Sequence, residues 1–208
     1  MSAFLGKIHY WLYDKIKLQE ELIENAAALA GENGYNGKAL LNASYSNYGY
    51  PVTGPLENAI ERDNIHGWLQ EKIISVESRL AYVLTELMQA DAVKKEDIAQ
   101  IFYKNGAEKM KQLGISEGTP EDFFNLIFDY MLEGMPCDRV NEVVQCNETM
   151  IEWHTTRDIH KEYWEQVIGD VSNYYYFKSA WINGFLSASD AGYEYTRTDN
   201  GMNTIKKV

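Results

Sequence analysis

The 208-residue chain has little cysteine, proline and histidine, and it has no long hydrophobic run. Its two cysteines, Cys137 and Cys146, are too few for the disulfide framework that stabilises small secreted domains. Its wholly apolar runs are only a few residues long, so none is expected to span a bilayer. Residues 1–12 lack a cationic start followed by an apolar run, so we expect no signal peptide and a cytoplasmic location.

Positive charge is also scarce, with 19 Lys and Arg against 31 Asp and Glu and a formal net charge of −12. Nucleic acids and anionic membrane surfaces carry the same sign, so we expect neither as a partner. Hydrophobic residues are plentiful at 45%, and 13% of the chain is aromatic. This balance is typical of a globular protein with a sizeable core.

Helical periodicity dominates the chain up to Gly134. It predicts helices over residues 2–30, from Asp63 or Asn64 to about residue 89, and over residues 94–113 and 120–133. Along the first helix, Glu20, Glu21 and Glu24 are expected to form a solvated face. The apolar stripe of the second helix consists of His66, Leu69, Ile73, Val76, Leu80, Leu84 and Leu87.

Residues 31–55 are rich in glycine and tyrosine and are expected to form a long ordered loop with one helical turn at residues 38–42. Its part over residues 45–50 would cover a ligand as a lid. The pattern predicts an N-terminal part, residues 1–62, and an α+β ligand-binding domain, residues 63–208, within one compact unit.

The period of the pattern changes after Gly134. Residues 139–146 and 149–156 predict a β-hairpin with a two-residue turn, in which Val144 faces Ile151. One face would then carry Val140, Val144, Cys146, Ile151 and Trp153, and the other Arg139, Asn141, Gln145, Glu152 and His154.

Two helices and a second hairpin are expected to complete the chain. The helices cover residues 159–167 and 171–186, and the hairpin covers residues 193–208 with its turn at Asn200-Gly201. The sequence therefore predicts an α+β fold, with a helical N-terminal half packed on a small antiparallel sheet made from two C-terminal β-hairpins.

From about residue 80 to residue 208 the expected order is helix, helix, helix, hairpin, helix, hairpin. This order, together with IFYKNGA (101–107), the helix before the first hairpin (120–134), WINGF (181–185) and YTRTDNG (195–201), resembles the 4-vinyl reductase domain and the related L-2-amino-thiazoline-4-carboxylic acid hydrolase family. The resemblance implies a small-molecule pocket between helices and a twisted sheet, and hydrolysis of a C–N bond. Those families tend to place a cysteine near the final strand, where residues 202–208 have none, so no catalytic residue is carried over.

His66, His154 and Glu152 are the candidate catalytic residues, because imidazole and carboxylate groups serve as general acids and bases. His66 interrupts an apolar stripe, where a histidine is either a hydrogen-bonded structural residue or a polar group of a pocket. His9 would approach His66 if the first two long helices pair.

The candidate ligand-binding residues centre on Lys178. Tyr174 and Trp181 lie one turn before and after it on the expected helix. Lys178 either reaches solvent past these rings in a cation–π contact or binds an anionic ligand such as a carboxylate. Tyr48, Tyr50 and Trp68 are the remaining candidate ligand-binding residues.

Several residues near the first predicted hairpin are of types that bind metal ions. His154, His160, Cys146, Cys137 and Glu152 are residue types that bind zinc or iron, but their spacing matches no standard site. We expect neither a metal nor another cofactor.

Three functions remain open at this level. The chain is a hydrolase of a small amide-like or amidine-like substrate, a ligand-binding or sensor module without turnover, or a haem or metal protein that uses His66, His154 or His160. The resemblance favours the first. The N-terminal helix either packs on its own domain or pairs with its copy in a homodimer.

Overall fold

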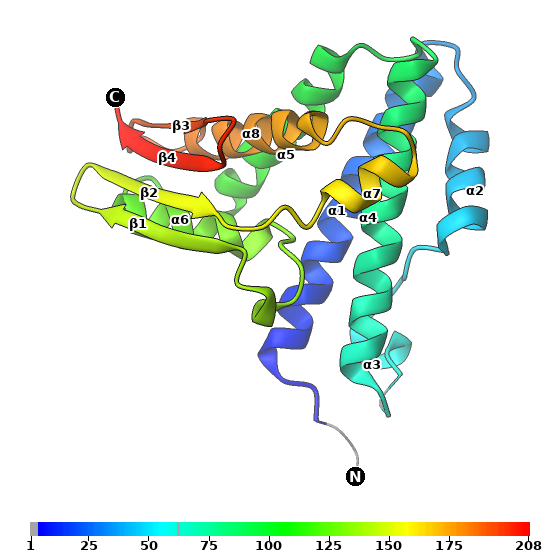
Figure 1. Ribbon diagram of the computed structural model, residues 1–208, viewed down its shortest axis with the longest axis horizontal. Coiled ribbons are helices and arrows are strands. Elements are labelled where there is room, and N and C mark those ends of the chain that lie inside the picture. The colour runs from blue at the N-terminus through cyan, green and yellow to red at the C-terminus, as the bar shows by residue number, and fades with distance from the viewer. Residues whose placement is uncertain (1–3, 62) are drawn as a thin grey trace. The chain divides into compact units, whose positions relative to one another are not determined.

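The computed structural model describes residues 4–61 and 63–208 and has the predicted α+β fold (Figure 1). Within these residues, a helical N-terminal half is followed by a small antiparallel sheet built from the two C-terminal hairpins. The helices and strands are α1 (Lys7–Glu32), α2 (Gly37–Tyr48), α3 (Leu56–Ala59), α4 (Ile65–Gln89), α5 (Lys95–Leu113), α6 (Pro120–Tyr130), β1 (Asn141–Cys146), β2 (Met150–Thr155), α7 (Lys161–Gln166), α8 (Ser172–Ser187), β3 (Tyr193–Arg197) and β4 (Met202–Lys207), with a 3₁₀ turn at Pro136–Asp138.

The chain forms two compact units. Unit 1 contains Met1–Val93, Tyr130–Pro136 and Glu162–Gly169, and unit 2 contains Lys94–Asp129, Cys137–Lys161 and Asp170–Val208. These units group α4 with α1 and α2, whereas the sequence-based division separates residues 1–62 from residues 63–208. The sequence-based division into residues 1–62 and 63–208 stays a prediction.

In unit 1, α1 and α4 run side by side and α2 packs against both (Figure 1). The Asn64 side chain caps α4 by accepting a hydrogen bond from the Gly67 N–H (3.1 Å), which confirms the predicted start. The apolar stripe of α4 is buried as predicted, except at His66, which is exposed while its neighbour Ile65 is buried. Most apolar residues of α1 are buried, and pairing with a second copy stays a prediction.

The segment expected as a loop instead contains α2, a helix of 12 residues. The Asn36 side chain accepts a hydrogen bond from the Ala39 N–H (3.0 Å) and caps this helix. A Cβ at Gly37 would lie 2.0 Å from the Ala27 carbonyl oxygen, so glycine allows α2 to start against α1. The prediction was wrong because the glycines mark the ends of a helix rather than a flexible stretch.

The limits of α1 also differ from the prediction. The helix continues through Gly31 to Glu32, because Gly31 keeps helical hydrogen bonding and no αL residue ends the helix there. The predicted cap, Ser2, lies outside the described residues, and the described helix begins at Lys7.

In unit 2, the four strands form one sheet in the order β1-β2-β4-β3 with antiparallel pairing throughout. The predicted Asn200-Gly201 turn is confirmed, and Gly201 adopts a φ of 82° that favours glycine. Helix α8 matches its prediction to within one residue at each end. Helices α6 and α7 are shorter than predicted and end at Tyr130 and Gln166.

The register of the first hairpin was predicted wrongly. Cys146 pairs with Ile151 and Val143 with Trp153, and a bulge separates Val143 from Gln145. The Asn147 side chain accepts hydrogen bonds from the N–H groups of Thr149 and Met150 (both 3.0 Å), and the Asn147 N–H donates to the Met150 carbonyl oxygen (2.8 Å), so the turn is centred one residue later than predicted.

Strand β1 lies at an edge of the sheet and is mostly exposed. Val144 and Cys146, expected on the core face, are exposed. Ile151 and Trp153 of β2 are buried, as predicted.

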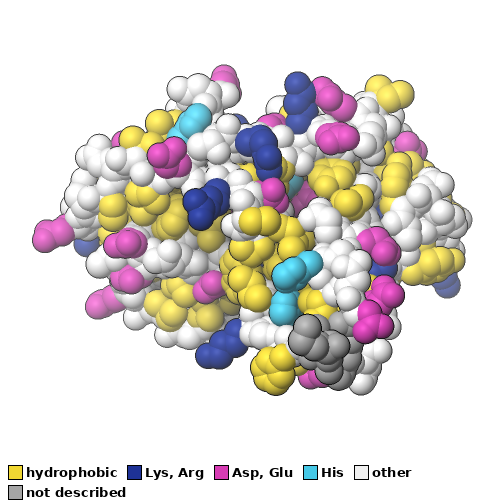
Figure 2. All heavy atoms as spheres, turned by 60° about the horizontal axis from the view of Figure 1, so that its bottom comes forward, with side chains coloured by type: hydrophobic (Ala, Val, Ile, Leu, Met, Phe, Trp, Pro, Cys, Tyr) yellow, Lys and Arg dark blue, Asp and Glu magenta, His cyan; other side chains and the backbone are white. Residues whose placement is uncertain are grey.

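Carboxylate side chains are scattered over the face displayed in Figure 2, among hydrophobic patches and fewer Lys and Arg side chains. This distribution agrees with the net charge of −12.

Within the described residues, no helix combines the length and apolar character needed to cross a membrane.

The start of α6 makes stability depend on pH. The Thr119 N–H (2.8 Å) and hydroxyl (2.7 Å) donate to Asp122 Oδ2, and these hydrogen bonds hold the pKa of Asp122 below its ordinary value. A lowered pKa in the folded state stabilises the fold above the unfolded pKa of about 4, and this contribution is lost as the pH falls through the folded pKa. Asp122→Asn should therefore lose less stability between pH 5 and pH 2.5 than the wild type does.

Urea unfolding at the two pH values measures this difference. Glu121→Gln removes a neighbouring charge from the same helical turn and serves as the control, which should keep the wild-type pH dependence. If Asp122→Asn and the wild type lost equal amounts of unfolding free energy between the two pH values, Asp122 would not be the source of this pH dependence.

Candidate functional site

Helix α8 holds Lys178 in a buried position, with 5% of the residue exposed. Its Nζ lies 5.8 Å from the ring centroid of Phe128 on α6. A side chain that reached open solvent past the rings of its own helix would be more exposed. The burial of Lys178 therefore argues against the first interpretation, in which the side chain reaches solvent.

Trp153 of β2 lies at the centre of an aromatic group in the same unit. Its ring meets Phe124 (5.0 Å between centroids) and Phe128 (5.9 Å) edge to face, and it stacks against Tyr195 (5.8 Å). Phe128 thus contacts both Trp153 and the ammonium of Lys178. We call these five residues, Phe124, Phe128, Trp153, Lys178 and Tyr195, the Trp153 cluster.

The indole nitrogen of Trp153 is a buried donor. Only 1% of the residue is exposed, and Nε1 finds no hydrogen-bond partner within residues 4–61 and 63–208. A buried donor without a hydrogen-bond partner destabilises the fold by about 1–3 kcal/mol, so a bound ligand that accepted this hydrogen bond would remove the cost.

The polar groups beside the cluster are satisfied, in contrast to Trp153. The Tyr195 hydroxyl donates to Asn203 Oδ1 (2.7 Å), and Asn203 Nδ2 donates to the Gly201 carbonyl oxygen (2.9 Å) and to Thr155 Oγ1 (3.1 Å). This network ties β2, β3 and β4 together and fixes the Tyr195 ring against Trp153.

The other candidates on α8 are engaged in packing. Trp181 Nε1 donates to Asn105 Oδ1 of α5 (2.8 Å), and its ring stacks on Phe185 (5.1 Å between centroids). The Tyr174 ring stacks on His160 (3.8 Å between centroids). Both side chains hold α8 in place beside Lys178.

Glu152 and His154 flank Trp153 along β2, so the alternation of a strand directs them to the opposite face of the sheet. His154 Nε2 lies 3.0 Å from the Asn200 carbonyl oxygen, and Glu152 Oε1 accepts a hydrogen bond from the Thr204 hydroxyl (3.4 Å). These two candidates therefore share a face with each other but not with Trp153.

The remaining candidates belong to unit 1. His66 is exposed, and its ring lies 5.6 Å from that of His9, which confirms the expected approach. Trp68 is buried with its ring 6.4 Å from Tyr13. Unit 1 therefore holds the candidates His66, Trp68, Tyr48 and Tyr50. Unit 2 holds Glu152, His154, Tyr174, Lys178 and Trp181.

Tyr48 lies in a helix rather than in the expected loop, whereas Tyr50 lies in the irregular segment after that helix. Tyr48 is the last residue of α2, and its ring is 5.6 Å from that of Tyr82. Tyr50 follows α2 and lies 5.6 Å from Tyr45. The helix holds Tyr48 where an ordered loop was expected.

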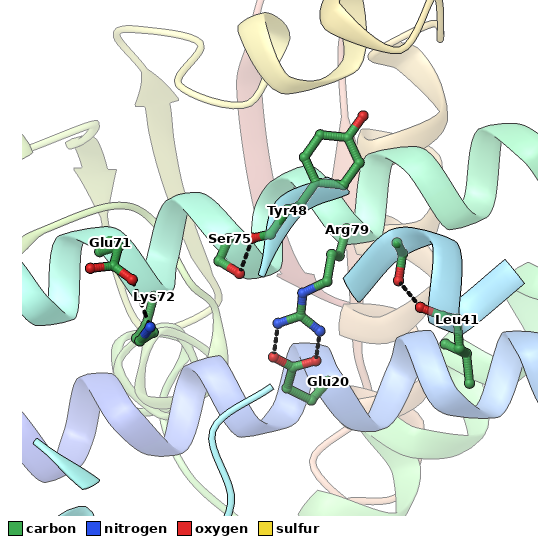
Figure 3. A network of polar contacts seen from close by, with 8 residues as sticks. Glu20, Leu41, Tyr48, Glu71, Lys72, Ser75 and Arg79 are labelled. Carbon is green, nitrogen blue, oxygen red and sulfur yellow. Dashed lines mark hydrogen bonds and ion pairs between the residues drawn. The ribbon is translucent and has the colours of Figure 1, made fainter. Parts of the chain in front are cut away.

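A buried ion pair between α1 and α4 was not foreseen. Glu20 and Arg79 form a bidentate pair, shown in Figure 3. Burial raises the pKa of Glu20, while the hydrogen bonds and charge of Arg79 act in the opposite direction. The prediction of a solvated face was wrong for Glu20, because its partner lies on a different helix, 59 residues away.

Metal ligands do not gather in the part of the chain that the structure describes, where no group of three or more His, Cys, Asp or Glu side chains could hold an ion. Cys137 and Cys146 are both exposed and carry free thiols.

Two residues of the Trp153 cluster, Phe124 and Phe128, were not among the candidates. They lie four residues apart on α6, a spacing that puts them on one face of a helix, but nothing local indicates which residues that face contacts.

Comparison of the chain with protein-family models, with curated proteins and with solved structures finds no match.

Proposed function

We propose that the chain is a cytoplasmic binding protein for a small molecule with a carboxylate and an apolar body, and that the Trp153 cluster holds this ligand without turning it over. The observation that carries the proposal is that the buried indole N–H of Trp153 has no hydrogen-bond partner within residues 4–61 and 63–208, and that the Trp153 ring and the Lys178 ammonium both lie against Phe128.

The chemistry of these donors selects the ligand. An anion beside the Lys178 ammonium would gain charge attraction in a site that is partly shielded from water. A carboxylate has a second oxygen, which can accept the hydrogen bond of the indole N–H. The rings of Phe124, Phe128 and Tyr195 supply the apolar surface that small-molecule sites use.

Binding without turnover is favoured by the position of the candidate catalytic residues. A general base must lie within hydrogen-bond reach of the group that it deprotonates. Glu152 and His154 project from the face of β2 opposite to Trp153. The resemblance to the 4-vinyl reductase domain supports a binding role equally well, since it implies a pocket between helices and a sheet.

Isothermal titration calorimetry with phenylacetate tests the proposal. Lys178→Met keeps most of the apolar side chain and removes the charge, and we expect it to weaken phenylacetate binding at least about tenfold. Lys206→Met removes an exposed charge from β4 of the same unit and should leave the affinity unchanged.

The neutral isostere phenylacetamide separates recognition of the carboxylate from adsorption of a benzene ring. It should bind at least about tenfold more weakly than phenylacetate. Equal affinities for the two compounds, or unchanged phenylacetate binding by Lys178→Met, would overturn the carboxylate assignment. Release of ammonia from phenylacetamide would show turnover and favour the hydrolase instead.

A further inference from the structure

Unit 1 carries a second group of side chains that the proposed function does not use. Two tyrosines and one carboxylate, Tyr48, Tyr82 and Glu86, lie beside the end of α2, and Tyr35 precedes the start of the same helix; all four side chains are half-buried. Tyr35 lies between α1 and α2, Tyr48 ends α2, and Tyr82 and Glu86 are one turn apart on α4. We call this group the Tyr82 cluster.

One hydrogen bond fixes the backbone at the end of α2 beside the Tyr82 cluster. The Ser75 hydroxyl donates to the Tyr48 carbonyl oxygen (2.6 Å) and fastens the end of α2 to α4, as Figure 3 shows. The Tyr48 and Tyr82 rings lie 5.6 Å apart and are inclined by 54°, so they form an open angle rather than a parallel stack.

Negative charge lies beside these rings. Glu86 is four residues after Tyr82, on the same face of α4. Burial, followed by the charge of Glu86, raises the pKa of both Tyr48 and Tyr82, and Tyr35 adds a smaller effect at Tyr82. The raised pKa values keep Tyr48 and Tyr82 neutral at physiological pH, so their rings lie as uncharged aromatic faces beside the Glu86 carboxylate.

The neighbouring Tyr45 has a cation beside its ring. The guanidinium carbon of Arg79 lies 5.7 Å from the Tyr45 ring centroid, so the chain itself supplies a cation there. Among residues 4–61 and 63–208, no Lys or Arg side chain makes such a contact with Tyr35, Tyr48 or Tyr82. The Tyr82 cluster has the rings and the carboxylate but takes no cation from these residues.

We propose that the Tyr82 cluster binds a small organic cation through a quaternary ammonium group. Aromatic faces attract such a cation through their quadrupole, and an adjacent carboxylate adds charge attraction. A quaternary ammonium sheds its weakly held water more readily than a primary ammonium does, which suits a site built mainly from rings. The net charge of −12 favours the approach of a cation.

Calorimetric titration with choline tests this site, with its uncharged isostere 3,3-dimethylbutan-1-ol as the control ligand. We expect choline to bind at least about tenfold more tightly than the alcohol. Glu86→Gln and Tyr82→Leu should each weaken choline binding by about three- to tenfold, whereas Tyr82→Phe keeps the ring and should bind as the wild type does.

A matched control is available on the same helix. Glu71→Gln makes the same change as Glu86→Gln at an exposed carboxylate paired with Lys72, and it should leave choline affinity unchanged. Equal binding of choline and the alcohol, or wild-type choline affinity in folded Glu86→Gln, would overturn the proposal. Both results are independent of phenylacetate binding, so this inference and the proposed function can fail separately.

Discussion

Glu20→Gln should lower the free energy of unfolding by about 3–5 kcal/mol, because it leaves the Arg79 guanidinium buried without its counter-charge. Arg79 is almost fully buried, and its bidentate pair with Glu20 is the charged contact shown between α1 and α4 in Figure 3. Urea unfolding followed by circular dichroism measures the loss.

Two further variants isolate the ion pair. Glu71→Gln breaks the exposed Glu71–Lys72 pair and should cost less than about 1 kcal/mol. The double variant Glu20→Leu with Arg79→Met replaces both charges by apolar side chains and should recover most of the stability lost in Glu20→Gln. If Glu20→Gln were no less stable than Glu71→Gln, the buried pair would not be holding the two helices together.

Gly184→Ala should cost at least about 1–3 kcal/mol, because the added methyl group has no space. A Cβ at Gly184 of α8 would lie 2.0 Å from the Tyr103 carbonyl oxygen of α5. The contact is reciprocal, since a Cβ at Gly106 of α5 would lie 2.1 Å from the Trp181 carbonyl oxygen of α8. The two backbones therefore cross at a distance that only glycine allows.

Gly31→Ala is the matched control for this crossing. Gly31 lies within α1 and has nothing within 4 Å of its ideal Cβ position, so alanine there should stabilise the protein by about 0.5–1 kcal/mol. Opposite signs for Gly31→Ala and Gly184→Ala in thermal unfolding are the expected result. Wild-type stability in Gly184→Ala would contradict the close crossing of α5 and α8.

The sequence predicted best those elements whose signals are local. Helix α4 follows from its capping Asn64 and its apolar stripe, and the last hairpin follows from Asn200-Gly201. Helix α2 was missed because its flanking glycines also fit a loop, and the close contact that requires Gly37 involves Ala27 of another helix. The register of the first hairpin was predicted wrongly because the Asn147 side chain stabilises a turn one residue later than expected.

The candidate site, too, was predicted only where its signals are local in the sequence. Lys178 was predicted from its helical neighbours, yet the ring beside its ammonium belongs to Phe128 on α6, and Trp153 comes from β2. Periodicity gives the face on which a residue lies but not the element that this face meets. Contacts between elements distant in sequence therefore had to come from the structure.

The indole N–H resonance of Trp153 in a ¹H–¹⁵N correlation spectrum tests carboxylate binding most directly. The chain has five tryptophans, and Trp153→Phe identifies the resonance by its loss. Adding phenylacetate should move this resonance downfield in a saturable way in the wild type, as the indole N–H gains a hydrogen bond, and the shift should disappear in Lys178→Met. A Trp153 resonance that stays in place at phenylacetate concentrations that saturate the calorimetric signal would contradict the proposed site.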